Sequence, residues 1–376
     1  MPLRTMPWFR LVLGTLLLSS SSAWAEWTVN MTPGVTAISR EIYSLHMIIF
    51  WICVVIGVVV FGVMFWSVFA HRKSKGAKAA QFHESTTVEL VWTTIPFVIL
   101  IAMAIPATKT LVKIYDSKES VVDVKVTGYQ WKWRYDYLND GFGFFSNLTT
   151  AQDEIYNKAP KGEHYLLEVD EPLVVPVNTK VRFLITANDV IHSWWVPAIA
   201  VKKDAIPGFV NESWTIIEEP GVYRGQCAEL CGKDHGFMPI VVVAKEQADY
   251  DVWVAERKAA ASAEAGLKDK VWTEEELMVR GEKTYATFCS ACHGAEGNGI
   301  PPAFPALKGS QIALGDKSAH IDLVINGKAG TAMAAFGSQL SEVDLAAVIT
   351  YERNAWGNDT GDVIQPVDIA NFKAAQ

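Results

Sequence analysis

The stretch CAELCGKDHGFMPIVVVA, residues 227–244, joins a loop rich in metal-ligand residues to an apolar run typical of a buried strand. The loop holds Cys227, Glu229, Cys231, His235 and Met238. A disulfide, a zinc site and a redox-active copper site are all compatible with this loop taken alone. The segments around it are needed to choose among them.

Those segments have the pattern of an all-β domain. VVDVKVTGYQWKWRYDY, residues 121–137, ends in strict alternation, which predicts one strand with Tyr129, Trp131, Trp133, Tyr135 and Tyr137 on a shared face. Turn residues separate further strand-like runs: HYLLEV (164–169), PLVVPV (172–177), KVRFLITA (180–187), SWTIIEE (213–219) and MPIVVVA (238–244). This spacing predicts a β-sandwich or barrel.

A further ligand residue lies outside the loop. His192, in DVIHSWWVP (189–197), is expected at a strand end 35 residues before Cys227. A Cys227–Cys231 disulfide would leave the histidines and the methionine without a role. Zinc accepts two Cys and two His but has no use for Met238. Copper suits thiolate and thioether ligands, and a second cysteine allows two thiolates to bridge two copper ions.

A second cysteine pair lies in CSACH, residues 289–293, the C-x-x-C-H pattern of covalent c-type haem attachment. Cys289 and Cys292 would form the thioethers and His293 would bind the iron. A helix opened by a Thr273/Glu276 capping box is predicted before it, and a closing helix from about Ser341 after it.

The second axial ligand of this haem is expected to be Met333, which lies in a predicted loop. Core packing is the other role considered for Met333. Met278, the other methionine of this domain, precedes the haem motif. Residues 273–360 resemble a small class I cytochrome c.

The N-terminal third is directed to a membrane. No charged residue lies between Glu41 and Arg72 or between Glu89 and Lys109, which predicts spans over about 45–70 and 90–110. A buried soluble hairpin is the alternative, and the length of the runs argues against it. The basic loop HRKSKGAK between the runs predicts a cytoplasmic loop, so the rest of the chain would be periplasmic or extracellular.

Residues 1–25 have the features of a secretory signal peptide: early arginines, a short apolar stretch and an A-x-A site ending at Ala25. An uncleaved anchor is the alternative. The expected division is a membrane hairpin at 26–111, a β domain at 112–245, a helix and linker at 246–272 and a cytochrome domain at 273–376. The net charge of −8 argues against binding to nucleic acid.

DVIHSWWVPAIAVKKDAIPG, GQCAELCGKDHGFMPIVV and the aromatic strand together resemble subunit II of haem–copper cytochrome c oxidases, in the caa3-type version with a fused cytochrome c. The resemblance covers essentially the whole chain after the signal peptide. It implies a two-helix hairpin, a cupredoxin-like barrel and an all-α class I cytochrome c domain.

The same resemblance implies a dinuclear copper centre, called CuA, on residues matching His192, Cys227, Cys231, His235 and Met238 and on the carbonyl of Glu229. The Glu229 side chain would reach a magnesium ion shared with subunit I. Trp131 matches the residue that receives electrons, and Glu89 matches a carboxylate at the mouth of a proton pathway. From the sequence alone, Glu89 is an ordinary interfacial charge and the aromatic residues are packing residues.

Electrons would therefore pass from haem c to CuA and on to the haem a/CuB subunit I, which would reduce oxygen with proton pumping. Subunit III and an upstream soluble cytochrome c or bc1-type complex are the other implied partners, at the bacterial inner membrane. Three other classes share part of this pattern: a free-standing membrane electron carrier, a nitrous-oxide reductase and a copper chaperone. Phe209 and three residues of the aromatic strand (Tyr129, Lys132 and Arg134) depart from the family pattern, so the docking surfaces are expected to differ from those of the family more than the metal ligands do.

Overall fold

The computed structural model describes residues 30–78, 81 and 83–376. The predicted signal peptide lies outside these residues. The described residues divide into two compact units, one of those up to residue 114 with 197–200 and one of residues 115–196 with 201–376.

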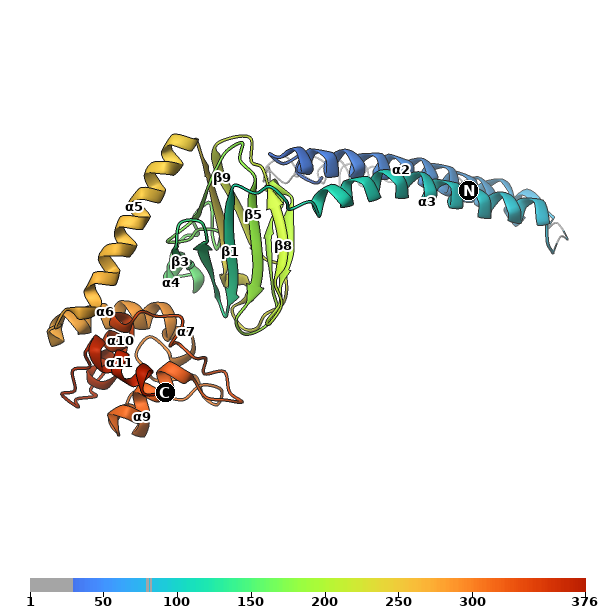
Figure 1. Cartoon of the computed structure of the whole chain (residues 1–376). Coiled ribbons are helices and arrows are strands. Elements are labelled where there is room, and N and C mark those ends of the chain that lie inside the picture. The colour runs from blue at the N-terminus through green and yellow to red at the C-terminus, as the bar shows by residue number, and fades with distance from the viewer. Residues whose placement is uncertain (1–29, 79–80, 82) are drawn as a thin grey trace. The chain divides into compact units, whose positions relative to one another are not determined.

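The first unit is built on two long helices, α2 (Ala37–Ala70) and α3 (Thr86–Ile114), with the short turns η1 (Lys73–Lys75) and η2 (Pro197–Ile199). Figure 1 shows α2 and α3 side by side as a hairpin. Both helices are long and apolar enough to cross a membrane. Large apolar side chains are exposed along both, including Trp66 at 71% and Leu90 at 66%. Such faces require lipid or protein cover, so the predicted two-span hairpin is confirmed.

Two features of the hairpin concern the continuity of α3 and the contact between α3 and α2. Pro96 and Pro106 lie inside α3 without ending it, as a spanning helix tolerates. The Glu41 carboxylate of α2 accepts hydrogen bonds from the Thr110 hydroxyl at 2.8 Å and from the Lys113 ammonium at 2.8 Å, both on α3. One carboxylate therefore joins the ends of the two helices.

The β domain consists of two five-stranded sheets, and the predicted all-β fold is confirmed. The first has the order β3-β2-β1-β5-β8 and the second β4-β10-β9-β6-β7 (Figure 1). The strands are β1 (Val122–Tyr129), β2 (Lys132–Tyr137), β3 (Phe142–Ser146), β4 (Leu173–Pro176), β5 (Val181–Ala187), β6 (His192–Val196), β7 (Val201–Ala205), β8 (Asn211–Thr215), β9 (Gly221–Cys227) and β10 (Pro239–Lys245). Two short helices, α4 (Gln152–Ile155) and η3 (His235–Phe237), lie in its loops.

Side chains from both sheets meet in the core of this domain. Trp194 of β6 and Tyr135 of β2 are fully buried, and the Trp194 indole N–H donates to the Tyr135 hydroxyl at 3.3 Å. The Tyr137 hydroxyl of β2 donates to the carbonyl of Val174 on β4 at 2.6 Å. Because the hydroxyl groups of Tyr135 and Tyr137 form hydrogen bonds with residues of the other sheet, they fix the alignment of one sheet over the other.

Two expectations about strands were wrong. The aromatic segment is not one strand: β1 and β2 form an antiparallel hairpin in which Tyr129 pairs with Lys132, so Gln130 and Trp131 form the turn. Only Trp133, Tyr135 and Tyr137 keep the predicted alternation, because they follow the turn. Residues 164–169 form turns with a single bridge from Val169 to Leu148 instead of a strand.

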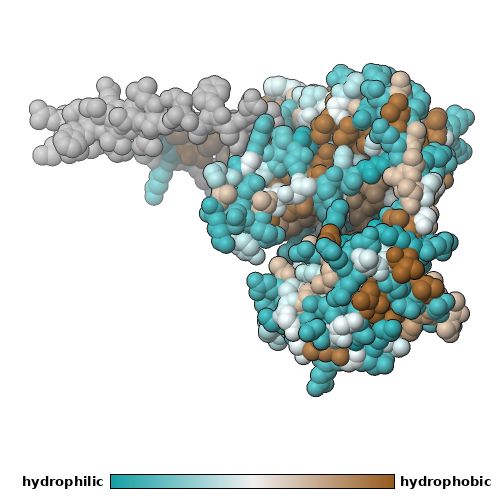
Figure 2. Space-filling model, turned by 90° about the vertical axis from the view of Figure 1, so that its left-hand side faces the viewer, coloured by the Kyte–Doolittle hydropathy of each residue, from teal (hydrophilic) through white to brown (hydrophobic). Residues whose placement is uncertain are grey.

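The C-terminal part is helical, as predicted. It contains α5 (Gln247–Gly266), η4 (Leu267–Asp269), α6 (Glu274–Phe288), α7 (Ser290–His293), α8 (Gln311–Leu314), α9 (Lys317–Asn326), α10 (Glu342–Asn354) and α11 (Pro366–Ala374). Thr273 and Glu276 form the expected capping box of α6, and Ser341 caps α10. Figure 2 shows one face of the unit formed by residues 115–196 and 201–376. Most residues on this face are polar, as expected for domains in water.

Candidate metal centres

The copper-type ligands are brought together by neighbouring strands of the second sheet. His192 is the first residue of β6 and Cys227 is the last residue of β9, and these strands pair with Trp194 opposite Cys227. The loop between β9 and β10 begins directly after Cys227, at the end of the sheet where β6 starts. Because β9 pairs with both β6 and β10, the loop must lie beside His192.

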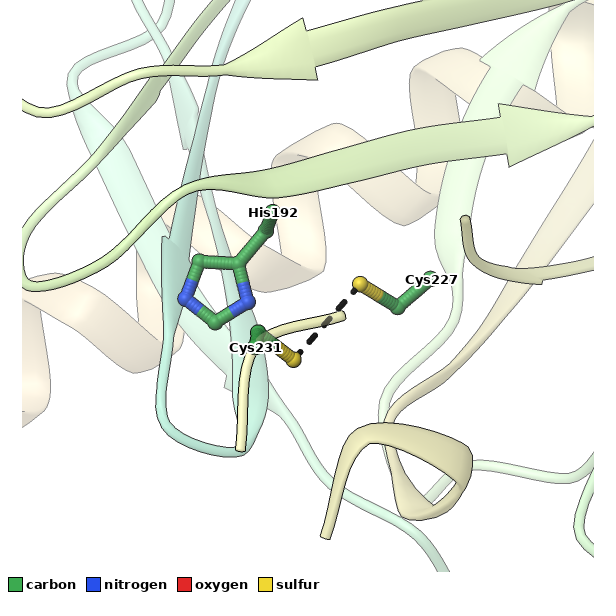
Figure 3. Close-up of side chains that lie close together, drawn as sticks. All are labelled: His192, Cys227 and Cys231. Carbon is green, nitrogen blue, oxygen red and sulfur yellow. Dashed lines mark hydrogen bonds between the residues drawn. The ribbon is translucent and has the colours of Figure 1, made fainter. Parts of the chain in front are cut away.

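The ligand atoms of His192, Cys227 and Cys231 all lie within 4.8 Å of one another, and all three residues are buried. Figure 3 shows the imidazole and both sulfur atoms turned toward a common centre. The two Sγ atoms are 3.8 Å apart, well beyond the roughly 2 Å of a disulfide bond.

The other loop ligands gather around Cys231. Its Sγ atom lies 3.5 Å from Nδ1 of His235 and 3.6 Å from Sδ of Met238, which is buried. The Glu229 carbonyl oxygen lies 3.4 Å from Sγ of Cys227, and the Glu229 side chain is exposed. All six residues predicted for the copper centre are therefore linked by short contacts.

The electrostatics favour an anionic sulfur in this cluster. The pKa of Cys227 is well below its usual range because the Cys231 thiol donates a hydrogen bond to it, with smaller effects from His192 and two backbone groups. Burial lowers the pKa of His192, but the hydrogen bond with the Asp189 carboxylate and the nearby Cys227 sulfur outweigh this effect and leave it raised. The thiolate is the form that binds a metal.

The residues present fit a metal at this position. Nδ1 of His192 is buried and has no hydrogen-bond partner. An unsatisfied buried ring nitrogen costs free energy unless something binds it, and here it lies among two cysteine sulfurs. The donor set of two thiols, two imidazoles and a thioether is one that copper prefers.

Two groups from the first sheet shape the site. A side chain at Gly128 would come within 2.8 Å of the His192 ring, so only glycine leaves room for the imidazole. Trp133 is fully buried, lies edge-on to the His192 ring at 5.9 Å, and donates its indole N–H to the Met238 carbonyl at 3.2 Å. Trp133 was predicted only as a member of the aromatic face, and its place on that face is the signal that could have indicated a role at the site.

The β1–β2 turn lies directly on the copper loop. The Trp131 indole N–H donates to the Cys231 carbonyl at 3.2 Å, and the Gln130 side-chain amide donates to the same oxygen at 2.9 Å. Gly232 has φ +118°, and a side chain there would press on the Trp131 ring. The tryptophan is therefore held against the loop through a turn, whereas the sequence placed it on a strand face.

The haem-type residues lie at the junction of α6 and α7. Cys289 is the N-cap of α7, which contains Cys292 and His293. Nδ1 of His293 lies 2.8 Å from the Pro305 carbonyl, to which it donates in the neutral ring. This contact leaves Nε2 of His293 as the ring nitrogen that can bind a haem iron as an axial ligand. Burial raises the pKa of both Cys289 and Cys292.

Two predicted site residues remain, Met333 and Glu89. Met333 is half-buried in the segment between α9 and α10, where its carbonyl accepts from the Lys328 backbone N–H at 3.0 Å. Glu89 is exposed in the first turn of α3. Asp189 was not among the predicted site residues, and it contacts His192; its position three residues before that histidine is the signal that could have found it.

Together, the apolar hairpin, the two-sheet domain with its sulfur and imidazole cluster, and the helical domain with its C-x-x-C-H segment define a class: membrane-anchored electron-transfer proteins with a cupredoxin-like domain and a cytochrome c domain.

Three family models match the chain. Residues 24–110 match the transmembrane domain of cytochrome c oxidase subunit II, residues 122–245 match its periplasmic domain, and residues 276–351 match subunit III of cbb3-type cytochrome c oxidase. The chain is 36% identical to a probable cytochrome c oxidase subunit 2 of Rickettsia bellii over 257 residues, which are 67% of this chain and 94% of that protein. It is also 36% identical to cytochrome c oxidase subunit 2 of Arabidopsis thaliana, covering 66% of this chain and 96% of that protein. The solved periplasmic domain of subunit II of Bradyrhizobium japonicum cytochrome oxidase is 41% identical and covers 38% of this chain and 98% of that domain, with a TM-score of 0.35.

The chain belongs to the cytochrome c oxidase subunit II family and carries a C-terminal cytochrome c domain. It is a two-pass membrane subunit of a haem–copper oxidase complex, with a periplasmic domain of the copper-binding type. The predicted family, fold class and enzyme complex are confirmed.

Proposed function

We propose that His192, Cys227, Cys231, His235 and Met238, with the Glu229 carbonyl, hold a dinuclear CuA centre that delivers electrons to subunit I. The observation that carries this proposal is the buried cluster of two sulfur atoms 3.8 Å apart beside an unpartnered imidazole nitrogen. The two thiolates of Cys227 and Cys231 would give a pair of copper ions two soft ligands, and the centre would supply one-electron transfer. Zinc would leave the buried thioether of Met238 unused, although it lies 3.6 Å from Cys231.

The C-terminal domain would hold a covalent c-type haem through Cys289 and Cys292, with His293 and Met333 as axial ligands. The contact of His293 with the Pro305 carbonyl supports this assignment, because it orients the ring and selects the free nitrogen. A thioether on the second side of the iron raises the reduction potential, which suits a carrier near the high-potential end of a respiratory chain.

The proposed route runs from an upstream donor to haem c, through Trp131 to CuA, and then to the haem of subunit I. The hydrogen bond from Trp131 to the Cys231 carbonyl supports this role, because it gives an unbroken contact between the indole and a copper ligand residue. A soluble cytochrome c or a bc1-type complex would supply the electrons at the periplasmic face of the bacterial inner membrane. Subunits I and III would complete the complex.

The boundaries that fit this function are a signal peptide at 1–25, a hairpin at 26–111, the CuA domain at 112–245, a connecting helix at 246–272 and the cytochrome domain at 273–376. Helix α5 fills most of the connecting segment. Its Trp253 lies 5.3 Å from the ring of Tyr137, so the helix begins against the β domain.

Metal and haem analysis of the full chain, purified in detergent and supplied with copper, tests the proposal. Two coppers and one covalent haem per chain are expected. One copper, or zinc in place of copper, would contradict the dinuclear assignment. In the whole oxidase, Glu229→Ala should keep the copper and lose a bound magnesium, because the carbonyl is retained and the exposed carboxylate is not.

Glu89 is proposed to collect protons at the cytoplasmic end of α3. Its exposed carboxylate and its place in the first helical turn support this role. Glu89→Gln should slow oxygen turnover of the whole complex and leave both metal spectra unchanged. Glu84→Gln, a neighbouring exposed position before the helix, is the matched control. Equal turnover in the two variants would return Glu89 to the role of an interfacial charge.

A further inference from the structure

Asp189 lies in the loop between β5 and β6 and makes contacts with two different parts of the copper region. Its Oδ1 atom lies 2.9 Å from Nε2 of His192. Its Oδ2 atom accepts a hydrogen bond from the backbone N–H of Gln130 at 2.7 Å. One carboxylate therefore joins the histidine that opens β6 to the turn between β1 and β2.

The contact with His192 decides which ring nitrogen is free. A neutral imidazole carries one N–H, and a carboxylate beside Nε2 holds the proton there. Nδ1 then presents its lone pair, and this is the nitrogen that is buried without a partner near both cysteine sulfurs. Carboxylates that accept from a ligating histidine orient the ring and increase its basicity.

The contact with Gln130 acts on the other side of the site. Gln130 immediately precedes Trp131, and the side chains of both donate to the Cys231 carbonyl. The backbone N–H of Gln130 is the group that Asp189 holds. The same carboxylate thus fixes one ligand ring and the turn that rests on another ligand residue.

We propose that Asp189 is a positioning residue of the copper centre, which selects the ligating nitrogen of His192 and holds the Gln130–Trp131 turn against the copper loop. This inference rests on the proposed CuA function. Asp189 also accepts from the backbone N–H of Val190 at 2.7 Å, so a role confined to its own loop is the competing account. The two accounts differ in what happens to the metal.

Asp189→Asn separates them with little change of shape. The amide has one oxygen, so it can accept from His192 or from Gln130 but not from both in the present arrangement. The expected result in the copper-loaded full chain is a loss of copper affinity of about 10- to 100-fold, the range found when such partners of ligating histidines are removed. The reduction potential of the copper centre should rise, since a less basic imidazole stabilises the oxidised state less.

Asp204→Asn, an exposed position on β7, is the control for the change in charge and should match the wild type. Copper affinity is measured by chelator competition, the potential by redox titration, and the ligand field by electron paramagnetic resonance. Circular dichroism and haem content report on folding in the same samples.

Asp189→Asn with wild-type affinity, potential and resonance spectrum would overturn the inference while leaving the copper function intact. A loss of copper that accompanies loss of the β-sheet signal would assign Asp189 a purely structural role and would also overturn it. If the wild-type chain binds no copper pair, the proposed function fails, and the inference fails with it.

Discussion

The copper cluster and the C-x-x-C-H segment use the same residue types but are assembled in different ways. Cys289, Cys292 and His293 lie within five consecutive residues, on a single turn of helix and its cap. His192 and Cys227 come from separate strands and meet only because β6 pairs with β9. The haem segment therefore depends on local conformation, and the copper cluster depends on the register of a sheet.

The two sites also differ in what surrounds them. The copper cluster receives groups from the opposite sheet, including the Trp133 ring against His192 and the room left by Gly128. His293, in contrast, has its ring nitrogen held by the carbonyl of Pro305, twelve residues along the chain. We expect perturbations of the β domain to reach the copper site over long distances, and perturbations of the haem site to remain local.

The largest expected effect separates the two sites by their cysteines. Cys227→Ser should lower copper affinity by more than about 100-fold, because loss of a ligand should exceed the 10- to 100-fold cost of losing a partner of a ligand. Covalent haem should remain. Cys292→Ser should weaken covalent haem attachment and leave copper in place. Metal analysis and a haem stain of denatured protein measure both, with Cys53→Ser in α2 as the control. Loss of both cofactors in either variant would show that the sites do not form independently.

The next effect tests Met333, the proposed haem ligand that lies farthest in the sequence from the C-x-x-C-H segment. Met333→Ala should keep the haem attached but lower its reduction potential by on the order of 0.1 V, within the roughly 0.8 V that axial ligands span. Met278→Ala, in α6, should leave the potential unchanged. Spectroelectrochemical titration measures the difference. A normal potential in Met333→Ala would mean that Met333 serves only in packing.

A smaller effect tests the contact between the turn and the copper loop. Trp131→Phe removes the hydrogen bond to the Cys231 carbonyl and shrinks the ring, while Gln130 still donates to the same oxygen. Electron transfer from haem c to the copper centre should slow about tenfold, equivalent to an increase of about 1.4 kcal/mol in the activation free energy. The spectra of both centres should remain unchanged. Rapid mixing with separate detection of haem and copper absorbance measures the rate. An unchanged rate would show that electrons reach the copper by another path.

The smallest effect concerns the stability of the sheet that supports the site. Arg182 of β5 donates two hydrogen bonds to Asp123 of β1, at 2.9 and 2.8 Å, and these hold the pKa of Asp123 below its usual range. A carboxylate with a lowered folded-state pKa stabilises the fold above its ordinary pKa of about 3.9, and this contribution is lost as pH falls through the lowered value. Asp123→Asn should therefore cost about 1 kcal/mol at about pH 7 and progressively less below about pH 4.

Urea unfolding followed by tryptophan fluorescence measures this difference, and Asp116→Asn, an exposed neighbour, is the control. A cost for Asp123→Asn that stays constant down to about pH 2 would exclude the ion pair as its source.

Local sequence was enough for much of this protein. Two long uncharged runs predict two spans, because about 20 apolar residues are needed to cross a bilayer and few other structures use them. The capping box of Thr273 and Glu276 and the C-x-x-C-H segment are patterns within a few residues, and α6 begins where the first predicts. The copper ligands could also be predicted from their residue types, since few other sites combine Cys, His and Met in this spacing.

Only the tertiary structure decided how those ligands are supported. Alternation of apolar and polar residues continues through a tight turn as well as along a strand, so the sequence could not reveal that Trp131 lies in a turn between β1 and β2. The role of Asp189 was partly hidden for a related reason: His192 follows it by only three residues, but Gln130 lies 59 residues away and reaches the same carboxylate only in the folded sheets. Contacts between distant residues depend on sheet register, which the folded chain sets through long-range packing.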